Sequence, residues 1–254
     1  MNKLICSVAF SALLFSNAIC GAAAPAISIC YVEPAQVELI SSKGTRILID
    51  VYQPSQLSYP ATEFDILLTT HTHSDHLNEG FLSSFRGKQL FVRTGEIKTA
   101  DVSIQGISSA HNEGDPLLPE SGTNYVFIVD MDGLRIAHFG DIGQNSLTPE
   151  QLATLGKVDI AVTQFDNDYS HMDVANKKGF KLMQQVRPLL IIPTHNSVKA
   201  VKYAMTLWPC LYSDSRLVRI SSDNLPKDTQ LLFLGSFAEI YGKLTNASHL
   251  EFQK

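Results

Sequence analysis

Residues 71–76 read His-Thr-His-Ser-Asp-His and directly follow the apolar stretch 64–70. Side chains alternate along an extended chain, so His71, His73 and Asp75 start out on one side, and a bend is needed to bring His76 round. Imidazole and carboxylate groups are common ligands of Zn²⁺ and similar ions. A polar loop that merely contains three histidines is the alternative, but it does not explain four ionisable groups in six residues. The run therefore predicts a metal site at the end of a buried strand.

Three isolated residues downstream are predicted to complete the site. His111 follows the extended segment 102–107, and His195 follows the apolar segment 189–194. Asp141 lies between two glycines in Gly-Asp-Ile-Gly. Because glycine has no side chain, the backbone at these positions can come close to an ion. A surface-loop histidine and a turn aspartate are the competing interpretations for His111 and Asp141.

Extended apolar segments alternate with helical ones, which predicts an α/β fold. The pair 125–131 and 134–138, joined at Asp132-Gly133, is typical of a hairpin with a type I′ turn. The expected strands are 27–32, 37–41, 45–51, 65–69, 89–92, 102–107, 125–131, 134–138, 159–164, 189–193 and 230–234.

Four helices are expected. One follows the histidine run with an apolar stripe from Leu77 to Phe85, and one has a capping box at residues 148–151 and closes at Gly156. A third is expected to be capped by Asp173 and stopped by Pro188, and a fourth spans 198–208. With no linker or repeat, residues 25–254 are expected to form a single domain.

Residues 1–24 resemble a secretory signal peptide, with Lys3 in a basic start, an apolar run and a small-residue segment. Cleavage is expected after Ala18 or among residues 22–24, so the protein is predicted to be exported and either periplasmic or secreted. A lipid anchor at Cys20 and an uncleaved membrane anchor are disfavoured. Cys30 and Cys210 are expected either to form one disulfide or to remain separate buried thiols.

The formal net charge of the chain is −5, and no basic stripe is present. Nucleic acid is therefore not an expected partner. A small-molecule substrate is expected instead, and bound divalent ions would still allow an anionic one. The sequence leaves the oligomeric state open.

The histidine run is similar to the signature of the metallo-β-lactamase superfamily, and the likeness extends from about residue 27 to 234. The resemblance implies a four-layer αβ/βα sandwich and two metal ions. It implies that Asp141 bridges both ions. The other ligands it implies are, for the first ion, His71, His73 and His111 and, for the second, Asp75, His76 and His195.

This resemblance implies a metal-dependent hydrolase. Two ions roughly 3.5–4 Å apart can share one hydroxide and lower the pKa of water from about 15.7 towards 7, which supplies a nucleophile. Asp75 is expected to be catalytic as well, by accepting or relaying a proton. Zinc is the expected metal, with Mn²⁺ or Fe²⁺ as alternatives for such a donor set. No Gly-x-Ser-x-Gly elbow is present to support a serine nucleophile.

The chain holds both His76 and Asp141, a combination that the resemblance associates with general hydrolases rather than true β-lactamases. The expected substrate is a lactone, phosphodiester or thioester, and the layout around residues 170–173 is most similar to the ascorbate-6-phosphate lactonase-like group. Two alternatives are β-lactamase activity and a non-hydrolytic metal-binding or redox role. Flavodiiron proteins carry a flavodoxin-like domain, for which the stretch after residue 234 is too short.

His171 is predicted to be catalytic without binding a metal. It follows the strand 159–164 by a short polar loop on the side where the ligand loops gather. A neutral imidazole there would bond the substrate or protonate a leaving group; the alternative is a solvent-facing histidine. His138 is expected to be buried rather than a ligand, and His249 to be inert.

Overall fold

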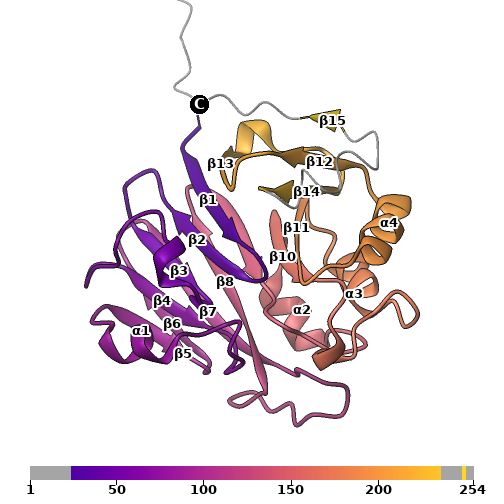
Figure 1. Cartoon of the computed structure of the whole chain (residues 1–254), viewed down its shortest axis with the longest axis horizontal. Helices are drawn as coiled ribbons and strands as arrows, with labels where there is room; N and C mark the ends of the chain where they lie inside the picture. The colour runs from indigo at the N-terminus through magenta and orange to yellow at the C-terminus, as the bar shows by residue number, and fades with distance from the viewer. Residues whose placement is uncertain (1–23, 236–247, 250–254) are drawn as a thin grey trace, which may run out of the picture.

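Strands form the centre of the computed structural model, which describes residues 24–235 and 248–249. They form two sheets, called here the small sheet and the large sheet (Figure 1). In spatial order the small sheet contains β13 (Leu217–Ser221), β1 (Ala26–Val32), β2 (Gln36–Ile40), β3 (Arg46–Ile49), β4 (Ile66–Thr69) and β5 (Lys88–Phe91). The large sheet contains β15 (Ser248–His249), β12 (Cys210–Ser213), β14 (Gln230–Leu234), β11 (Leu190–Thr194), β10 (Ile160–Gln164), β9 (Leu134–His138), β8 (Asn124–Met131), β7 (Val102–Ser109) and β6 (Gly95–Lys98).

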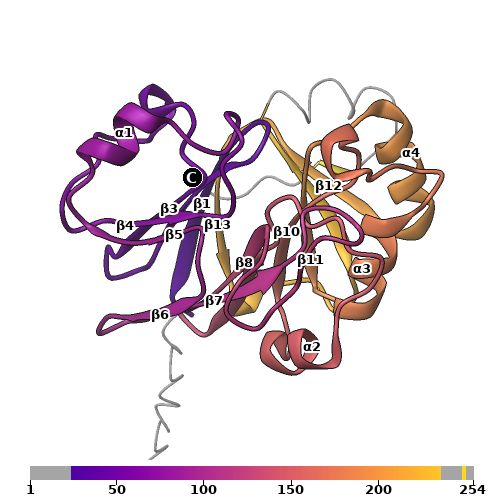
Figure 2. The ribbon, with the colours of Figure 1, turned by 90° about the horizontal axis from the view of Figure 1, so that it is seen from below.

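The helices cover the outer faces of the two sheets. Helix α1 (Glu79–Ser84) lies on the small sheet; α2 (Pro149–Leu155), α3 (Lys178–Val186) and α4 (Val198–Leu207) lie on the large sheet (Figure 2). Three short 3₁₀ turns are η1 (Pro54–Gln56), η2 (Asp168–Ser170) and η3 (Ser222–Asn224). The order of layers is helix, sheet, sheet, helix, which confirms the predicted αβ/βα sandwich.

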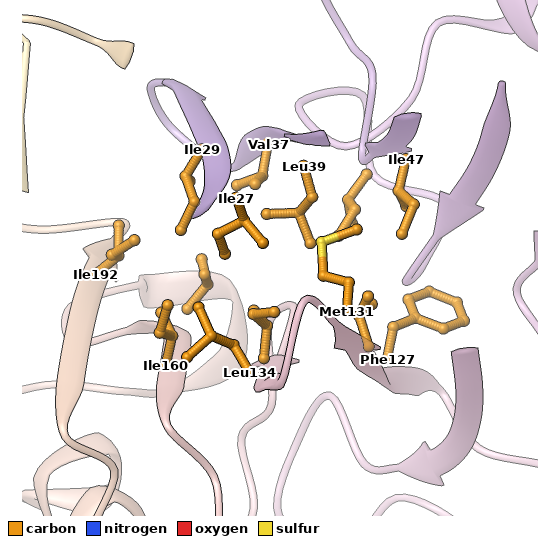
Figure 3. Close-up of a cluster of buried hydrophobic side chains, with 14 of the residues drawn as sticks. Ile27, Ile29, Val37, Leu39, Ile47, Phe127, Met131, Leu134, Ile160 and Ile192 are labelled. Carbon is orange, nitrogen blue, oxygen red and sulfur yellow. The ribbon is translucent and has the colours of Figure 1, made fainter. Parts of the chain in front are cut away.

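Alternation along each strand explains the layers. In β3, Ile47 and Ile49 belong to the core between the sheets, whereas Leu48 packs with Phe85 under α1. In β10, Ile160 and Val162 point into the central core shown in Figure 3, while the alternate residue faces the helices. A strand that is buried on both faces has a continuous apolar sequence, which is why these strands could be predicted from the sequence.

Strand direction brings the important loops to one edge. Strands β3, β4 and β5 are parallel in the small sheet, and β9, β10 and β11 are parallel in the large sheet. Strand β7 is antiparallel to β8, and β8 to β9, so β7 and β9 run the same way. The segments that follow β3 and β4 in the small sheet therefore gather, as do those that follow β7, β9, β10 and β11 in the large sheet.

Several local predictions are confirmed. Asp132 and Gly133 both have positive φ, 49° and 77°, as a type I′ hairpin turn requires, and Met131 pairs with Leu134. The capping box at Thr148 is formed, and α2 ends at Gly156.

Two helix predictions are wrong in their starting points. Asp173 does not cap α3: its carboxylate accepts the N–H of Asn176 in a turn, and the helix begins only after Lys177. Helix α1 begins at Glu79, not directly behind the histidine run, because Asn78 caps it by accepting the N–H of Phe81.

Of the two alternatives for Cys30 and Cys210, the structure has the separate thiols. Cys30 lies in β1 of the small sheet and Cys210 in β12 of the large sheet, and both are free thiols. The predicted signal peptide lies outside the described residues, apart from Ala24. None of the helices among residues 24–235 and 248–249 is long and apolar enough to cross a membrane.

Candidate metal centre

The structure brings all seven predicted ligands together at one edge of the two sheets, in two groups. In each group the candidate ligand atoms lie within 4.8 Å of one another. The first group is His71, His73, His111 and Asp141; the second group is Asp75, His76 and His195. The small sheet supplies the residues that follow β4, and the large sheet supplies those that follow β7, β9 and β11.

Asp141 lies between the two groups. Its Oδ2 is 3.6 Å from His71 Nε2 and 3.8 Å from His111 Nε2. Its Oδ1 is 3.3 Å from Nε2 of both His76 and His195. One carboxylate oxygen therefore faces each group, which is the geometry of a bridging ligand.

Short polar contacts hold Asp141 in place. Its backbone N–H donates to Asn124 Oδ1 at 3.0 Å, and its Oδ2 accepts from Asn167 Nδ2 at 2.7 Å. The preceding Gly140 has φ +54°, and a Cβ there would come 2.5 Å from Asn124 Oδ1. The close approach of the chain around Asp141 thus depends on glycine, as the sequence predicted.

Asp50 links the two groups through hydrogen bonds, directly to His76 and through Thr70 to His71. It is fully buried at the end of β3; its Oδ1 accepts the N–H of Thr70 and its Oδ2 accepts the hydroxyl of Thr70 and Nδ1–H of His76. Because the Thr70 hydroxyl donates to Asp50, its lone pair can accept Nδ1–H of His71 at 3.0 Å. His71 then directs an unprotonated Nε2 inward, the form in which imidazole binds a metal, and His76 reaches that form once it gives up the proton on its Nε2.

The pKa values of the candidate ligands differ widely from one another. Burial lowers the pKa of His76, but the charge of Asp50, the close approach of Asp141 and the hydrogen bond to Asp50 outweigh it and raise the pKa to about 10. Burial together with the neighbouring His76 charge lowers the pKa of His71 to about 3. Burial also lowers the pKa of His111 and His195. Burial raises the pKa of Asp141, yet its contacts with His76 bring it well below the usual value, so it is ionised.

The arrangement fits divalent metal ions. His71 Nε2, His111 Nε2 and Asp141 Oδ1 are buried and have no hydrogen-bond partner among the described residues. The imidazole nitrogens near Asp141 Oδ1 come within 3.3 Å but lack hydrogen-bond alignment. Orphaned buried donors and acceptors are costly unless something pairs with them, and N/O donor sets of this kind bind Zn²⁺, Mn²⁺ and Fe²⁺.

One side of the cluster is open. His71, His76, His111 and Asp141 are buried, whereas His73 is exposed and the side chain of Asp75 is 39% exposed. The ring of Tyr169, itself 76% exposed, meets His73 edge-on with centroids 5.9 Å apart. A substrate therefore reaches the cluster from the side of His73, Asp75 and Tyr169.

The structure places His171 beside the cluster but in neither group. It ends the η2 turn with φ 49°, is exposed, and lies with Nδ1 2.9 Å from Asn112 Oδ1. Asn112 Nδ2 in turn lies 3.1 Å from His111 Nδ1. His138 is buried as predicted, with Nδ1 accepting the N–H of Gly140 and Nε2 facing the Ala35 carbonyl.

Four residues that hold the candidate ligands in place were not predicted from the sequence: Asp50, Thr70, Asn124 and Asn167. A carboxylate at the end of the apolar strand 45–51 was a signal for Asp50, since its strand end resembles those of the ligands. The two asparagines gave none, because amides are ordinary loop residues and their aim depends on tertiary contacts.

The sequence of this chain matches the family described as the β-lactamase superfamily domain over residues 28–195. The chain belongs to this superfamily. A relative named UPF0173 metal-dependent hydrolase, from Thermococcus onnurineus, is 21% identical over 74% of this chain and 88% of its own length.

Two solved structures share the fold. One, from Thermotoga maritima, is named a candidate zinc-dependent hydrolase of the metallo-β-lactamase superfamily; it is 19% identical, covers 82% of this chain and 98% of its own, and has a TM-score of 0.60. The other, a candidate metal-dependent hydrolase from Parabacteroides distasonis, is 18% identical, covers 82% and 93%, and has a TM-score of 0.55.

Proposed function

We propose that the protein is an exported hydrolase that binds two divalent metal ions, zinc first among them, and cleaves an ester-type bond in a small molecule. The observation that carries this proposal is the position of Asp141 between two groups of imidazoles, with one oxygen facing each. A single structural metal would not require a carboxylate shared in this way. The curated relative, a metal-dependent hydrolase by name, supports the same reaction class.

The bound ions would activate a water molecule and polarise the scissile bond. The chain's own residues prepare the site for this chemistry: Asp50 fixes the rings of His71 and His76, and Asn167 and Asn124 fix Asp141. Asp75, on the open side, is the carboxylate that can take a proton from the attacking water. His171, also exposed, is the proposed donor to the leaving group.

A lactone, a phosphodiester and a thioester all remain candidate substrates. The ascorbate-6-phosphate lactonase-like group stays a prediction of the sequence alone. The open side of the cluster presents an aromatic ring, Tyr169, and the ion pairs of Asp75 and Asp141 among the described residues are with histidines rather than with lysine or arginine. That composition favours a substrate whose only anionic group, if any, is the one held at the metal ions.

The test is Asp141→Ala in the mature protein, with metal analysis after gel filtration and a screen of lactones, phosphodiesters, thioesters and β-lactams. The wild type should hold close to two equivalents, and the variant should lose chiefly the ion of the second group. Hydrolysis should fall by about 10²–10³, as when one key electrostatic contributor is removed. A well-folded wild type without metal, or a variant that keeps both ions and full activity, would contradict the proposal.

Export has a separate test. The full chain, expressed in a bacterial host with a C-terminal tag, should appear outside the cytoplasm with a new N-terminus after residue 18 or among residues 22–24. Lys3 and the apolar run provide the signal-peptide pattern that supports this. Intact Met1 on cytoplasmic protein would contradict it and would leave the hydrolase proposal untouched.

A further inference from the structure

The amide of Asn112 stands between two imidazoles, one in the metal cluster and one outside it. Asn112 Nδ2 is 3.1 Å from His111 Nδ1, and Asn112 Oδ1 is 2.9 Å from His171 Nδ1. His111 Nε2, at the far side of its ring, is buried, unpartnered and directed at Asp141. This chain of contacts joins the exposed His171 to the interior of the cluster.

Donor and acceptor roles along the chain are coupled. An amide presents two N–H donors on one side and an acceptor oxygen on the other, and its two orientations fill the same space. In the orientation observed, Asn112 donates to His111 Nδ1, so the ring proton of His111 is on Nε2. In the same orientation, Asn112 accepts from Nδ1–H of His171.

A metal ion on His111 reverses these roles. The ion takes the lone pair of Nε2, so the proton of His111 must move to Nδ1, where it needs an acceptor. Asn112 can supply one only by turning its oxygen towards His111. Its N–H₂ group then faces His171 and donates to Nδ1, which leaves the proton of a neutral His171 on Nε2.

We propose that Asn112 is a positioning residue whose side chain turns over when a metal ion binds His111, and that this sets which nitrogen of His171 carries the proton. The inference rests on the proposed function and deepens it, because it makes His171 an Nε2–H donor only once the first group is loaded. Other contacts hold the His171 loop independently: Asn176 Nδ2 donates to the His171 carbonyl at 2.6 Å, and Asn167 pairs with Met172 through backbone hydrogen bonds.

Zinc titration of the metal-free mature protein, labelled with ¹⁵N at histidine, tests the inference. Long-range ¹H–¹⁵N spectra report which ring nitrogen is protonated, and a His171→Gln sample assigns the His171 signals. We expect His171 to change from an Nδ1–H to an Nε2–H pattern as the His111 signals show zinc on Nε2. Zinc bound at His111 with an unchanged His171 pattern would overturn the inference while the proposed function stands. No zinc binding at all would overturn the proposed function.

Two variants separate coupling from simple support. Asn112→Ala removes the acceptor for His111, so its His171 pattern should not respond to zinc, and zinc affinity at the first group should fall about 10–100-fold, the usual cost of losing such a partner. Asn112→Asp offers two acceptor oxygens, so it should bind zinc more tightly than Asn112→Ala while His171 keeps Nδ1–H throughout.

Asn176→Ala is the matched control, because it removes a contact of the His171 loop and leaves the bridging amide intact. It should retain the zinc-dependent change of the His171 pattern. Loss of that change in Asn176→Ala, with Asn112 still present, would mean that loop order rather than the amide governs His171, and would overturn the inference.

Discussion

Asp50 supports one ligand of each group, although it belongs to neither. Through Thr70 it orients His71 of the first group, and directly it orients His76 of the second. A buried carboxylate that accepts three hydrogen bonds cannot be replaced by an amide without loss, since an asparagine has only one acceptor oxygen. The ligand geometry of both groups therefore depends on this one residue.

Replacing Asp50 with Asn should weaken the binding of both metal ions by about 10–100-fold, because His71 and His76 lose the partner that orients them. Competition with a chelating dye measures the two affinities. The control is Asp65→Asn: Asp65 is also buried and bonded to Arg46, but it precedes β4, at the far end of the strand from the site. That variant should lose stability and keep its metal affinity; equal affinity losses in both variants would contradict a specific role for Asp50.

The raised pKa of His76 predicts that metal binding releases a proton. Its pKa of about 10 in the metal-free protein means that it is protonated at pH 7.5, whereas a metal ligand must be neutral. The pKa of His71, about 3, means that His71 has no proton to release. Calorimetry in buffers of different ionisation enthalpy should therefore detect about one proton per chain from His76 at this pH, in addition to the proton that a metal-bound water would lose.

The raised pKa of His76 determines in which direction stability and metal affinity change with pH. Protonated His76 stabilises the metal-free fold fully below its unfolded pKa of about 6.5, and this contribution is lost as the pH rises through about 10. Metal affinity should rise over the same interval, because fewer protons compete. Metal binding to the Asp50→Asn variant should release fewer protons, because the charge that raises the pKa of His76 is gone. An unchanged number of protons released by that variant would contradict the assignment of the proton to His76.

Gly143 controls how closely two of the ligand loops pack. A Cβ on this residue would lie 2.0 Å from the carbonyl oxygen of His111 and 2.7 Å from that of Ser170, both backbone atoms that cannot swing aside. The loop after β9 thus touches the loop after β7 and the η2 turn at one point. Any side chain there would push His111 away from Asp141.

Gly143→Ala should therefore reduce metal content at the first group and lower stability by about 1–3 kcal/mol, the usual cost of overpacking. Metal analysis and denaturant unfolding measure the two effects. Gly80→Ala in α1 is the control, since its Cβ would meet only Asn78 Oδ1 at an ordinary 3.4 Å. Full metal content in Gly143→Ala would show that the loops can separate without disturbing His111.

Strand ends were predictable where the strand was buried on both faces. β4 and β11 each read as an apolar run followed by polar residues, which located His71 and His195 along with the strands. Strand β6 was missed because it is a short strand at the sheet edge with alternate residues exposed. Strand β13 was missed because it joins the small sheet by pairing with β1, nearly two hundred residues earlier, and nothing local encodes that pairing.

At the scale of the whole molecule, the candidate metal centre lies where the two sheets meet. The small sheet supplies Asp50 and the segment 71–76, whereas the large sheet supplies His111, Asp141 and His195. The central core joins the sheets over most of their area through apolar contacts. At the ligand edge the contacts are polar: His76 Nε2 lies 3.1 Å from His195 Nε2. His71 Nε2, His111 Nε2 and Asp141 Oδ1 are buried there without a hydrogen-bond partner among the described residues.

Metal ions would therefore connect the sheets, and their removal should lower thermal stability. Ligands that bind only the native state stabilise it by about 2.7 kcal/mol at 100 times their dissociation constant. For a chain of this size each kcal/mol corresponds to about 2–4 °C in Tm, so zinc at that concentration should raise Tm by about 5–11 °C for each ion bound, relative to the chelator-treated protein. Scanning calorimetry measures the shift. Asp141→Ala, which lacks the carboxylate facing both groups, should show less than half of it; an equal shift in that variant would mean that zinc stabilises the protein from elsewhere.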